Sequence, residues 1–245
     1  MGKKKRNYLL ERVLEIMRKK RRGKVLDLGC GDGDYGNSLK NMGFDVLSAD
    51  IDYDRFKYHK IIPFVRLNID RELPFPEGEF DYVLFIETIE HIYNPDFVIG
   101  QIRRVLKLGG VLILSTPNIL NLNSRLRFLF QGSFDFFREP TLDYARVFPG
   151  GLQNMHVIPW RYQELEYLLY KNNILVRGVY TDLLKHILKF PWFMLSPMIK
   201  LSYHLKERRT TIRNSGFSYK RIHKILLSKE LLFGRHLIIV GEKVS

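Results

Sequence analysis

Two acids and one histidine that can each accept a proton stand close together in this sequence, namely Glu87, Glu90 and His91. They follow residues 82–86, which are apolar throughout, as in a central parallel strand that is buried on both faces. The spacing i, i+3 and i+4 predicts that the three side chains share one face of a helical turn at the carboxyl end of that strand. Such a group can act as a general base, which removes the proton that a hydroxyl or amine loses in a reaction.

A second stretch with chemical potential follows the aliphatic run 25–28. Gly29, Gly31 and Gly33 stand at every second position, and a helix is expected to begin at Asp34. Without Cβ atoms, such a loop can adopt strained dihedral angles and bring a ligand onto the backbone N–H groups at the helix N-terminus. An ordinary glycine-rich turn is the alternative interpretation. A dinucleotide site fits poorly, because Asp34 occupies the position where its third glycine should stand.

The frame of this loop, Asp27-x-Gly29-x-Gly31-x-Gly33, resembles the first motif of the class I S-adenosylmethionine-dependent methyltransferases. The runs LPFPEGEFD and RVLKLGGVLILSTPN, at 73–81 and 104–118, resemble later motifs of that family, as in its ubiquinone-pathway O-methyltransferases. The resemblance implies an α/β fold with a Rossmann-like, doubly wound sheet of seven strands. Its last strand would be antiparallel, between the fifth and the sixth, and its cofactor would be S-adenosyl-L-methionine.

The residues expected to bind this cofactor lie at or near the ends of the first four strands. Asp50 ends the second strand, about 20 residues after the glycine loop, where one carboxylate can accept both hydroxyls of a ribose. Ile51 or Asp52 should border the adenine, and alignment with the family places Asn68 and Ile69 at its edge. Cys30 should contribute only its backbone N–H. The whole expected set is Asp27, Gly29, Cys30, Gly31, Gly33, Asp50, Ile51, Asn68, Ile69 and Ile86.

Together with His156, the acids and histidine of the first cluster resemble a Glu-x-x-Glu-His set with a distant histidine. Some methyltransferases, in the ubiquinone pathway and at small-RNA 3′ ends, hold a divalent metal with such a set. Carboxylates and a neutral imidazole suit Mg, Mn or Zn, so the spacing alone does not choose the ion. Two alternatives stay open: a base without a metal, or a purely structural role in which Glu90 and His91 cap their helix and bond the neighbouring loop.

The positive charge of the chain is unevenly placed. Its 245 residues carry a formal net charge of +14. Residues 1–24 hold eleven Lys/Arg against two Glu, residues 183–229 hold eleven against one, and the remainder has 18 basic and 23 acidic residues. The two basic segments indicate an anionic surface outside the cofactor pocket. One cysteine allows no intrachain disulfide, and no apolar signal core follows the basic N-terminus, so we expect a cytoplasmic protein.

The methyltransferase domain is predicted to comprise residues 23–181 and 230–245. Residues 1–22 should form a basic amphipathic helix that serves as a lid or docking element. Residues 119–155 are predicted to be irregular and aromatic, and to cover the substrate at the carboxyl edge of the sheet. The alternative is a satellite hydrophobic cluster under a long loop, and the two are compatible. Residues 182–229 fit no element of such a core, and we expect a basic and apolar helical insertion before the last strand.

These patterns predict a methyltransferase that modifies an oxygen of a lipid-linked, quinone-like or glycan substrate. Two other classes stay open: an RNA methyltransferase that neutralises phosphates with the basic segments, and a protein that binds the cofactor without catalysis. The apolar stretch 183–201 is too interrupted by Lys and Pro to span a bilayer. It could pack on the domain, or lie in the interface of an anionic membrane. The second interpretation predicts peripheral attachment to the inner membrane face.

Overall fold

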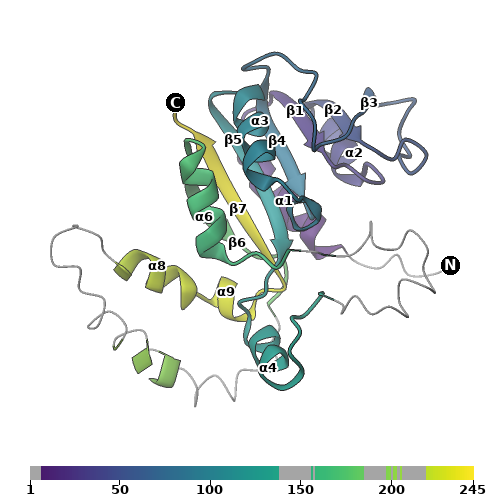
Figure 1. Cartoon of the computed structure of the whole chain (residues 1–245). Coiled ribbons are helices and arrows are strands. Elements are labelled where there is room, and N and C mark those ends of the chain that lie inside the picture. The colour runs from purple at the N-terminus through teal and green to yellow at the C-terminus, as the bar shows by residue number, and fades with distance from the viewer. Residues whose placement is uncertain are drawn as a thin grey trace.

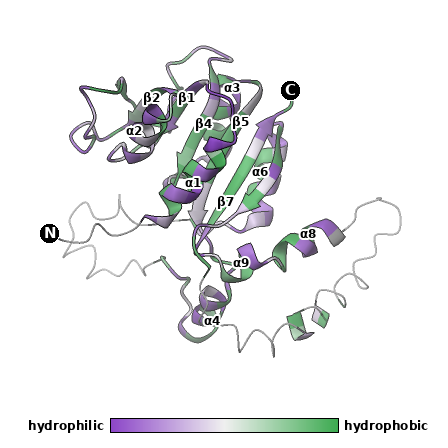
Figure 2. Ribbon diagram, turned by 180° about the vertical axis from the view of Figure 1, so that it is seen from behind, coloured by the Kyte–Doolittle hydropathy of each residue, from purple (hydrophilic) through white to green (hydrophobic). Residues whose placement is uncertain are grey.

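A single seven-stranded sheet forms the centre of the molecule, with helices on both of its faces (Figure 1). The structure, a computed structural model, describes residues 7–137, 156, 158–184, 197–199, 201–202, 205 and 219–245. The strands are β1 (Lys24–Leu28), β2 (Asp45–Asp50), β3 (Phe64–Arg66), β4 (Phe80–Ile86), β5 (Leu106–Pro117), β6 (Ile174–Tyr180) and β7 (His236–Lys243). The central strands β4 and β7 are mainly hydrophobic, as Figure 2 shows, because both of their faces are buried.

The strand order is β3-β2-β1-β4-β5-β7-β6. Strands β1 to β5 are parallel, whereas β7 runs antiparallel to both β5 and β6. The predicted doubly wound sheet with an antiparallel last strand is therefore confirmed. One consequence matters for the site: the first residue of β7 pairs with the last residue of β5, at the carboxyl edge of the parallel strands.

Helices of two groups cover the sheet. The helices are α1 (Tyr8–Arg18), α2 (Asp34–Asn41), α3 (Pro95–Val105), α4 (Leu122–Gln131), α6 (Tyr162–Lys171), α8 (Tyr219–Leu226) and α9 (Lys229–Phe233), with a 3-10 turn η1 (Ile89–His91). Leu9 and Val13 of α1 and Leu39 of α2 pack in one buried cluster. Ile99 of α3 and Leu165 of α6 belong to the other. The sheet is thus the middle layer of three.

Polar caps define where several helices begin. The side chain of Asn7 accepts a hydrogen bond from Leu10 N at 3.1 Å, so α1 begins as the amphipathic pattern predicts. Asn94 caps α3 in the same way, and Pro95 occupies the first helical position, where its missing N–H has no partner to lose.

The prediction that residues 119–155 are irregular was wrong for 122–131, which form α4. Asn121 accepts a hydrogen bond from Ser124 N at 2.9 Å, and Gly132 ends the helix with a φ of +69°. Asn121 and Gly132 are both typical capping residues, but the many aromatic residues of this segment favoured the interpretation as an irregular loop. Residues 138–155, which hold the rest of the predicted lid, lie outside the described residues.

The end of the predicted insertion packs on the domain. Leu226 of α8 is buried in the same cluster as the core of β4, and Ile222 and Ile225 pack against that cluster. Most of the apolar stretch 183–201, with Trp192 and Phe193, and the basic residues before Asn7 lie outside the described residues. Among the helices that the structure describes, none is long and apolar enough to cross a membrane.

Candidate functional site

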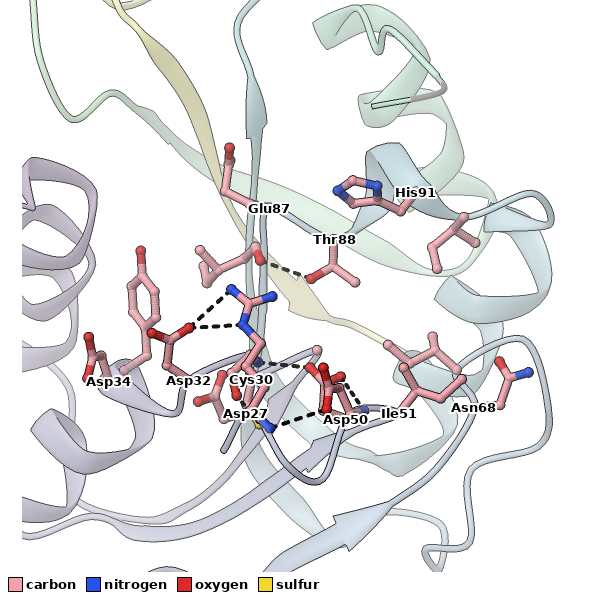
Figure 3. Close-up of a pocket in the computed structure, with 18 of the residues that line it drawn as sticks. Asp27, Cys30, Asp32, Asp34, Asp50, Ile51, Asn68, Glu87, Thr88 and His91 are labelled. Carbon is pink, nitrogen blue, oxygen red and sulfur yellow. Dashed lines mark hydrogen bonds and ion pairs between the residues drawn. The ribbon is translucent and has the colours of Figure 1, made fainter. Parts of the chain in front are cut away.

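A cavity of about 830 Å³ opens at the carboxyl edge of the sheet, among the loops that follow β1, β2 and β4 (Figure 3). Nine of the ten residues predicted to bind the cofactor line it: Asp27, Gly29, Cys30, Gly31, Asp50, Ile51, Asn68, Ile69 and Ile86. Glu87 and His91 also line the cavity, whereas Glu90 and His156 do not. The thiol of Cys30 is buried, and that burial raises its pKa, which agrees with a role for its backbone alone.

The glycines of the loop after β1 are required for two different reasons. Gly29 has a φ of +74°, and a Cβ there would lie 2.6 Å from Oγ1 of Thr88, on the loop after β4. Gly33 has a φ of +86°, and its Cβ would overlap the ring of Phe56. Gly33 does not line the cavity. Its place in the motif is explained by packing and by the start of α2 rather than by ligand contact.

Asp50 is held at the tip of β2 by backbone amides. Its Oδ2 accepts a hydrogen bond from Gly31 N at 2.8 Å, and its Oδ1 accepts one from Asp52 N at 3.0 Å. A carboxylate has about four lone-pair sites, so both oxygens can still accept hydroxyl groups from a ligand. The position suits the ribose of a nucleoside.

Asp27 lies deeper, at the end of β1, and is only 2% exposed. Its Oδ2 accepts a hydrogen bond from Gly36 N at 3.1 Å, near the start of α2. Burial raises the pKa of Asp27 to about 7, against this hydrogen bond, which lowers it. A positive ligand in the cavity would favour the ionised form of this carboxyl.

The charge of the cavity wall identifies the kind of cofactor that fits. Its acidic residues are Asp27, Asp32, Asp34, Asp50, Asp52, Asp70 and Glu87, against the single guanidinium of Arg55. Arg55 is already paired with Asp32, with Nη2 3.1 Å from Oδ1. A pyrophosphate would be repelled here, whereas a nucleoside that carries a sulfonium and an ammonium group would be attracted. The donor set therefore fits S-adenosyl-L-methionine.

Glu87 faces the cavity from a strained position. It directly follows β4 with a φ of +49°, and its N–H donates to the carbonyl oxygen of Ser115 at 3.1 Å. Its Oε1 accepts a hydrogen bond from Ser115 Oγ at 2.8 Å, and its Oε2 lies 3.4 Å from Nε2 of His236. Burial raises the pKa of Glu87, although the charge of His236 acts against that shift. A carboxylate that takes up a proton more readily is a better general base near neutral pH.

The prediction that Glu87, Glu90 and His91 share one helical face was wrong. The turn after β4 is a 3-10 turn of three residues, and Glu87 precedes it in a left-handed conformation. The side chain of Glu87 therefore contacts Ser115 of β5 and His236 of β7. Glu90 and His91 lie together near His156 instead. Figure 3 shows Glu87 and His91 diverging on either side of Thr88.

Glu90, His91 and His156 come together. One potential ligand atom from each lies within 4.8 Å of the others, and the two imidazole centroids are 5.1 Å apart. Glu90 is fully buried, and neither of its carboxylate oxygens makes a hydrogen bond to the described residues. Burial, and then the charge of Glu87, raise its pKa well above the usual range. Burial also lowers the pKa of His156 to about 4, so its imidazole is neutral, as a metal ligand requires.

Sequence reasoning missed two residues at this edge, Asp182 and His236. His236 is the first residue of β7, and Asp182 follows β6 by two residues. Their side chains are joined by a 2.7 Å contact between Nδ1 and Oδ2. The predicted antiparallel last strand could have indicated His236, because the first residues of such a strand lie at the carboxyl edge of its parallel neighbours.

Comparison with known proteins agrees with this geometry. A family model described as "Methyltransferase domain" matches residues 1–166. A probable S-adenosylmethionine-dependent methyltransferase of Mycolicibacterium smegmatis is 34% identical over 100 residues, which are 38% of each chain. The ubiquinone biosynthesis O-methyltransferase of Psychrobacter cryohalolentis is 27% identical over 132 residues, which are 46% of this chain and 51% of that protein. The chain thus spans about half or less of the curated relatives that it matches.

Solved structures share the fold over nearly the whole chain. The crystal structure of a SAM-dependent methyltransferase from Archaeoglobus fulgidus has a TM-score of 0.58 and 19% identity, and the match covers 96% of this chain and 94% of that one. The family model covers well over half of the sequence, including the glycine loop, Asp50 and the residues that follow β4. The chain belongs to the class I S-adenosylmethionine-dependent methyltransferase family.

Proposed function

We propose that this chain is an active methyltransferase that uses S-adenosyl-L-methionine to modify an oxygen of a lipid-linked, quinone-like or glycan acceptor. One observation carries the proposal: a cavity rich in carboxyl groups has an amide-held acid, Asp50, at one end and a strained acid, Glu87, at the other. The first suits a ribose, and the second suits an acceptor that must lose a proton. The relative named for ubiquinone biosynthesis supports an oxygen of a quinone-like acceptor.

Each residue has a specific task in this proposal. When bound, the cofactor supplies a methyl group on a positively charged sulfur. Asp50 would accept the hydroxyl protons of its ribose, and Asn68 would bond the edge of its adenine. Glu87 would take the proton that the acceptor hydroxyl loses, with Ser115 Oγ donating to its other oxygen. His91 also lines the cavity, and it is the second group able to accept that proton if it holds no metal ion.

A methyl-transfer screen with isotopically labelled cofactor tests this function. Lipid, glycan and RNA extracts are the acceptors, and the Glu87→Gln variant is compared with the wild type. We expect label in a lipid or glycan fraction and a loss of at least about 100-fold in the variant, the usual range for a removed acid–base group. Label in RNA alone would favour the RNA methyltransferase. Cofactor binding in calorimetry without transfer to any fraction would favour a binding protein.

A divalent metal at Glu90, His91 and His156 is a second element of the proposal. It is favoured by a fully buried carboxylate without a hydrogen-bond partner among the described residues, beside an imidazole that burial keeps neutral. Calorimetry with Zn²⁺, Mn²⁺ and Mg²⁺ should detect a site of 1:1 stoichiometry that Glu90→Gln abolishes. The exposed His59 supplies the control variant His59→Gln, which should bind the ion as the wild type does. If none of the three ions binds, the cluster has a base or structural role.

Docking on an anionic membrane surface is the third element. The eleven basic residues of 183–229 and the Trp and Phe near position 192 supply charge and apolar insertion. Leu129 and Phe130 on α4 add apolar surface, since they are 71% and 80% exposed. Co-sedimentation with vesicles that contain anionic lipid should fall for the double variant Trp192→Ala, Phe193→Ala. Equal binding by the variant and the wild type, or none by either, would contradict docking through this segment.

A further inference from the structure

An acid, an imidazole and a second acid form a continuous chain at the acceptor end of the cavity. Asp182 Oδ2 contacts Nδ1 of His236 at 2.7 Å, and Asp182 Oδ1 accepts a hydrogen bond from the backbone N of His236 at 2.9 Å. On the other side of the ring, Nε2 lies 3.4 Å from Oε2 of Glu87. The side chains of Asp182 and His236 are 2% and 12% exposed, whereas that of Glu87 is 26% exposed. The chain therefore runs from the interior to the cavity.

The topology of the sheet creates this arrangement. Glu87 follows parallel strand β4, and Asp182 follows β6. His236 opens β7 and pairs with Pro117, the last residue of β5. Because β7 runs in the opposite direction, its beginning lies at the edge where the other strands end. Three strand termini thus place three titratable groups in one line.

The contacts around the ring favour a protonated imidazole, because Nδ1 is bonded to the carboxylate of Asp182 and Nε2 faces the carboxylate of Glu87. Burial alone would lower the pKa of His236, but the hydrogen bond to Asp182 and the charge of Glu87 outweigh it, and the pKa is raised. The charge of Arg235 acts in the opposite direction. Burial would raise the pKa of Asp182, yet its hydrogen bond and ion pair with His236 keep it lowered. The 2.7 Å contact with Asp182 and the facing carboxylate of Glu87 thus both favour the charged form of the ring.

We propose that His236, held by Asp182, is a positioning residue that keeps the carboxylate of Glu87 ionised and directed to the methyl-transfer end of the cavity. The inference rests on the proposed function, since it assigns a support to the base named there. An imidazole whose second nitrogen is oriented by a carboxylate is a general device for orienting a reactive group. Here the reactive group is the outer carboxylate, because Glu87 lines the cavity and the imidazole stands behind it.

A comparison of two cofactor analogues tests this role without knowledge of the acceptor. S-adenosylhomocysteine lacks the methyl group and is neutral at sulfur, whereas sinefungin carries an ammonium group at the position of the transferred methyl. An ionised Glu87 that faces this position should bind sinefungin more tightly than S-adenosylhomocysteine. The ratio of the two dissociation constants, measured by calorimetry, therefore reports the charge and direction of Glu87.

We expect Glu87→Gln to reduce this preference for sinefungin about tenfold. His236→Gln keeps a donor of similar reach but loses the charge, and Asp182→Asn loses the charge that holds the ring. Each should reduce the preference about three- to tenfold, with the affinity for S-adenosylhomocysteine within about twofold of the wild type. Their thermal unfolding is measured beside that of His59→Gln, a change at an exposed imidazole, which should leave both affinities unchanged.

The other outcomes are distinguishable. A preference that stays or rises in both His236→Gln and Asp182→Asn would overturn the positioning role. An equal loss of affinity for both analogues, with lowered melting temperatures, would show that the pair is only structural. If the wild type binds neither analogue, the proposed function itself fails, before any variant is compared.

Discussion

At the end of the cavity that we assign to the cofactor, the carboxylate of Asp50 is held by the backbone amides of Gly31 and Asp52. At the end that we assign to the methyl acceptor, the carboxylate of Glu87 is bonded by the side chain of Ser115 and faces that of His236. The first set lies within one β-loop-α-β segment. The second set brings together β4, β5 and β7, which are distant in sequence. Backbone amides are present whatever the sequence, so the cofactor end depends on loop shape, and the acceptor end depends on particular side chains. The difference explains how one fold can keep its cofactor while acceptors change.

The largest effect that tests this comparison is expected from Asp50→Ala. The variant loses the group that would accept two ribose hydroxyls, and hydrogen bonds to charged groups contribute roughly 1.5–3 kcal/mol each. Calorimetry should show S-adenosyl-L-methionine binding weakened by at least about 100-fold. Asp45→Ala, at the exposed start of the same strand, is the matched control. Affinity within about threefold of the wild type in Asp50→Ala would refute the ribose assignment.

The two ends of the cavity meet at Gly29 and Thr88, which gives the next prediction. Gly29→Ala combines a positive φ with a Cβ only 2.6 Å from Thr88 Oγ1, and we expect a loss of roughly 2–4 kcal/mol in urea unfolding. Gly132→Ala has a similar φ of +69° and open space around its Cβ, so it should lose only about 1 kcal/mol. Adding Thr88→Ala should recover part of the loss at Gly29. Strict additivity in that double variant would mean that the two loops do not touch.

Asn118 tests how the acceptor end is assembled. Its buried Nδ2 contacts the carbonyl oxygens of Glu230, Leu231 and Gly234 at 3.3, 3.0 and 2.9 Å, and so ties the end of β5 to α9 and its C-cap, just before β7. We expect Asn118→Ala to destabilise the protein by about 2 kcal/mol, because these buried carbonyls lose their donor.

The exposed Asn123 provides a control for this change, since Asn123→Ala should alter the free energy of unfolding by less than about 0.5 kcal/mol. A similarly small effect at Asn118 would mean that α9 and the start of β7 are held in place without this side chain. Asn118→Asp should be at least as harmful as Asn118→Ala, because an anion there would face three carbonyl oxygens.

The smallest effect concerns Asp27 and depends on pH. Its pKa is raised to about 7 in the folded protein, so folding binds a proton that the unfolded chain releases above its ordinary pKa of 3.8. This group therefore makes the protein less stable as the pH rises from about 4 to about 7. Asp27→Asn removes that dependence and still accepts the hydrogen bond of Gly36 N.

We expect the variant to be about 1–2 kcal/mol more stable than the wild type at pH 8, since relaxation around a buried charge reduces its cost. The two proteins should be equally stable at pH 4. The measurement is urea unfolding of both proteins across this range without cofactor. The lowered pKa of His156 makes stability rise with pH, which is the opposite sign, but it does so equally in both proteins. The difference between their free energies of unfolding therefore reports Asp27 alone. A constant difference at every pH would contradict the buried, protonated carboxyl.

Much of the fold was predictable because its signals are local. The apolar run of β4, the caps Asn94 and Pro95, and the alternation of strands with helices all lie within short windows of sequence. The same holds for the cofactor end, where Asp50 and the glycines are placed by the strands that precede them. Helix α4 was missed although its caps Asn121 and Gly132 were visible, because aromatic residues suggested a loop.

The sequence by itself determined which segments form most of the strands, the glycine loop and the acid that ends β2, since each depends on neighbours in the chain. Only the tertiary structure decided which titratable groups meet at the acceptor end. A single positive φ at Glu87 separated it from Glu90 and His91, and sheet pairing placed His236 beside it. Contacts between distant strands depend on the packing of the whole sheet, and the direction of a side chain can depend on a single dihedral angle. A local sequence pattern therefore predicts neither of them.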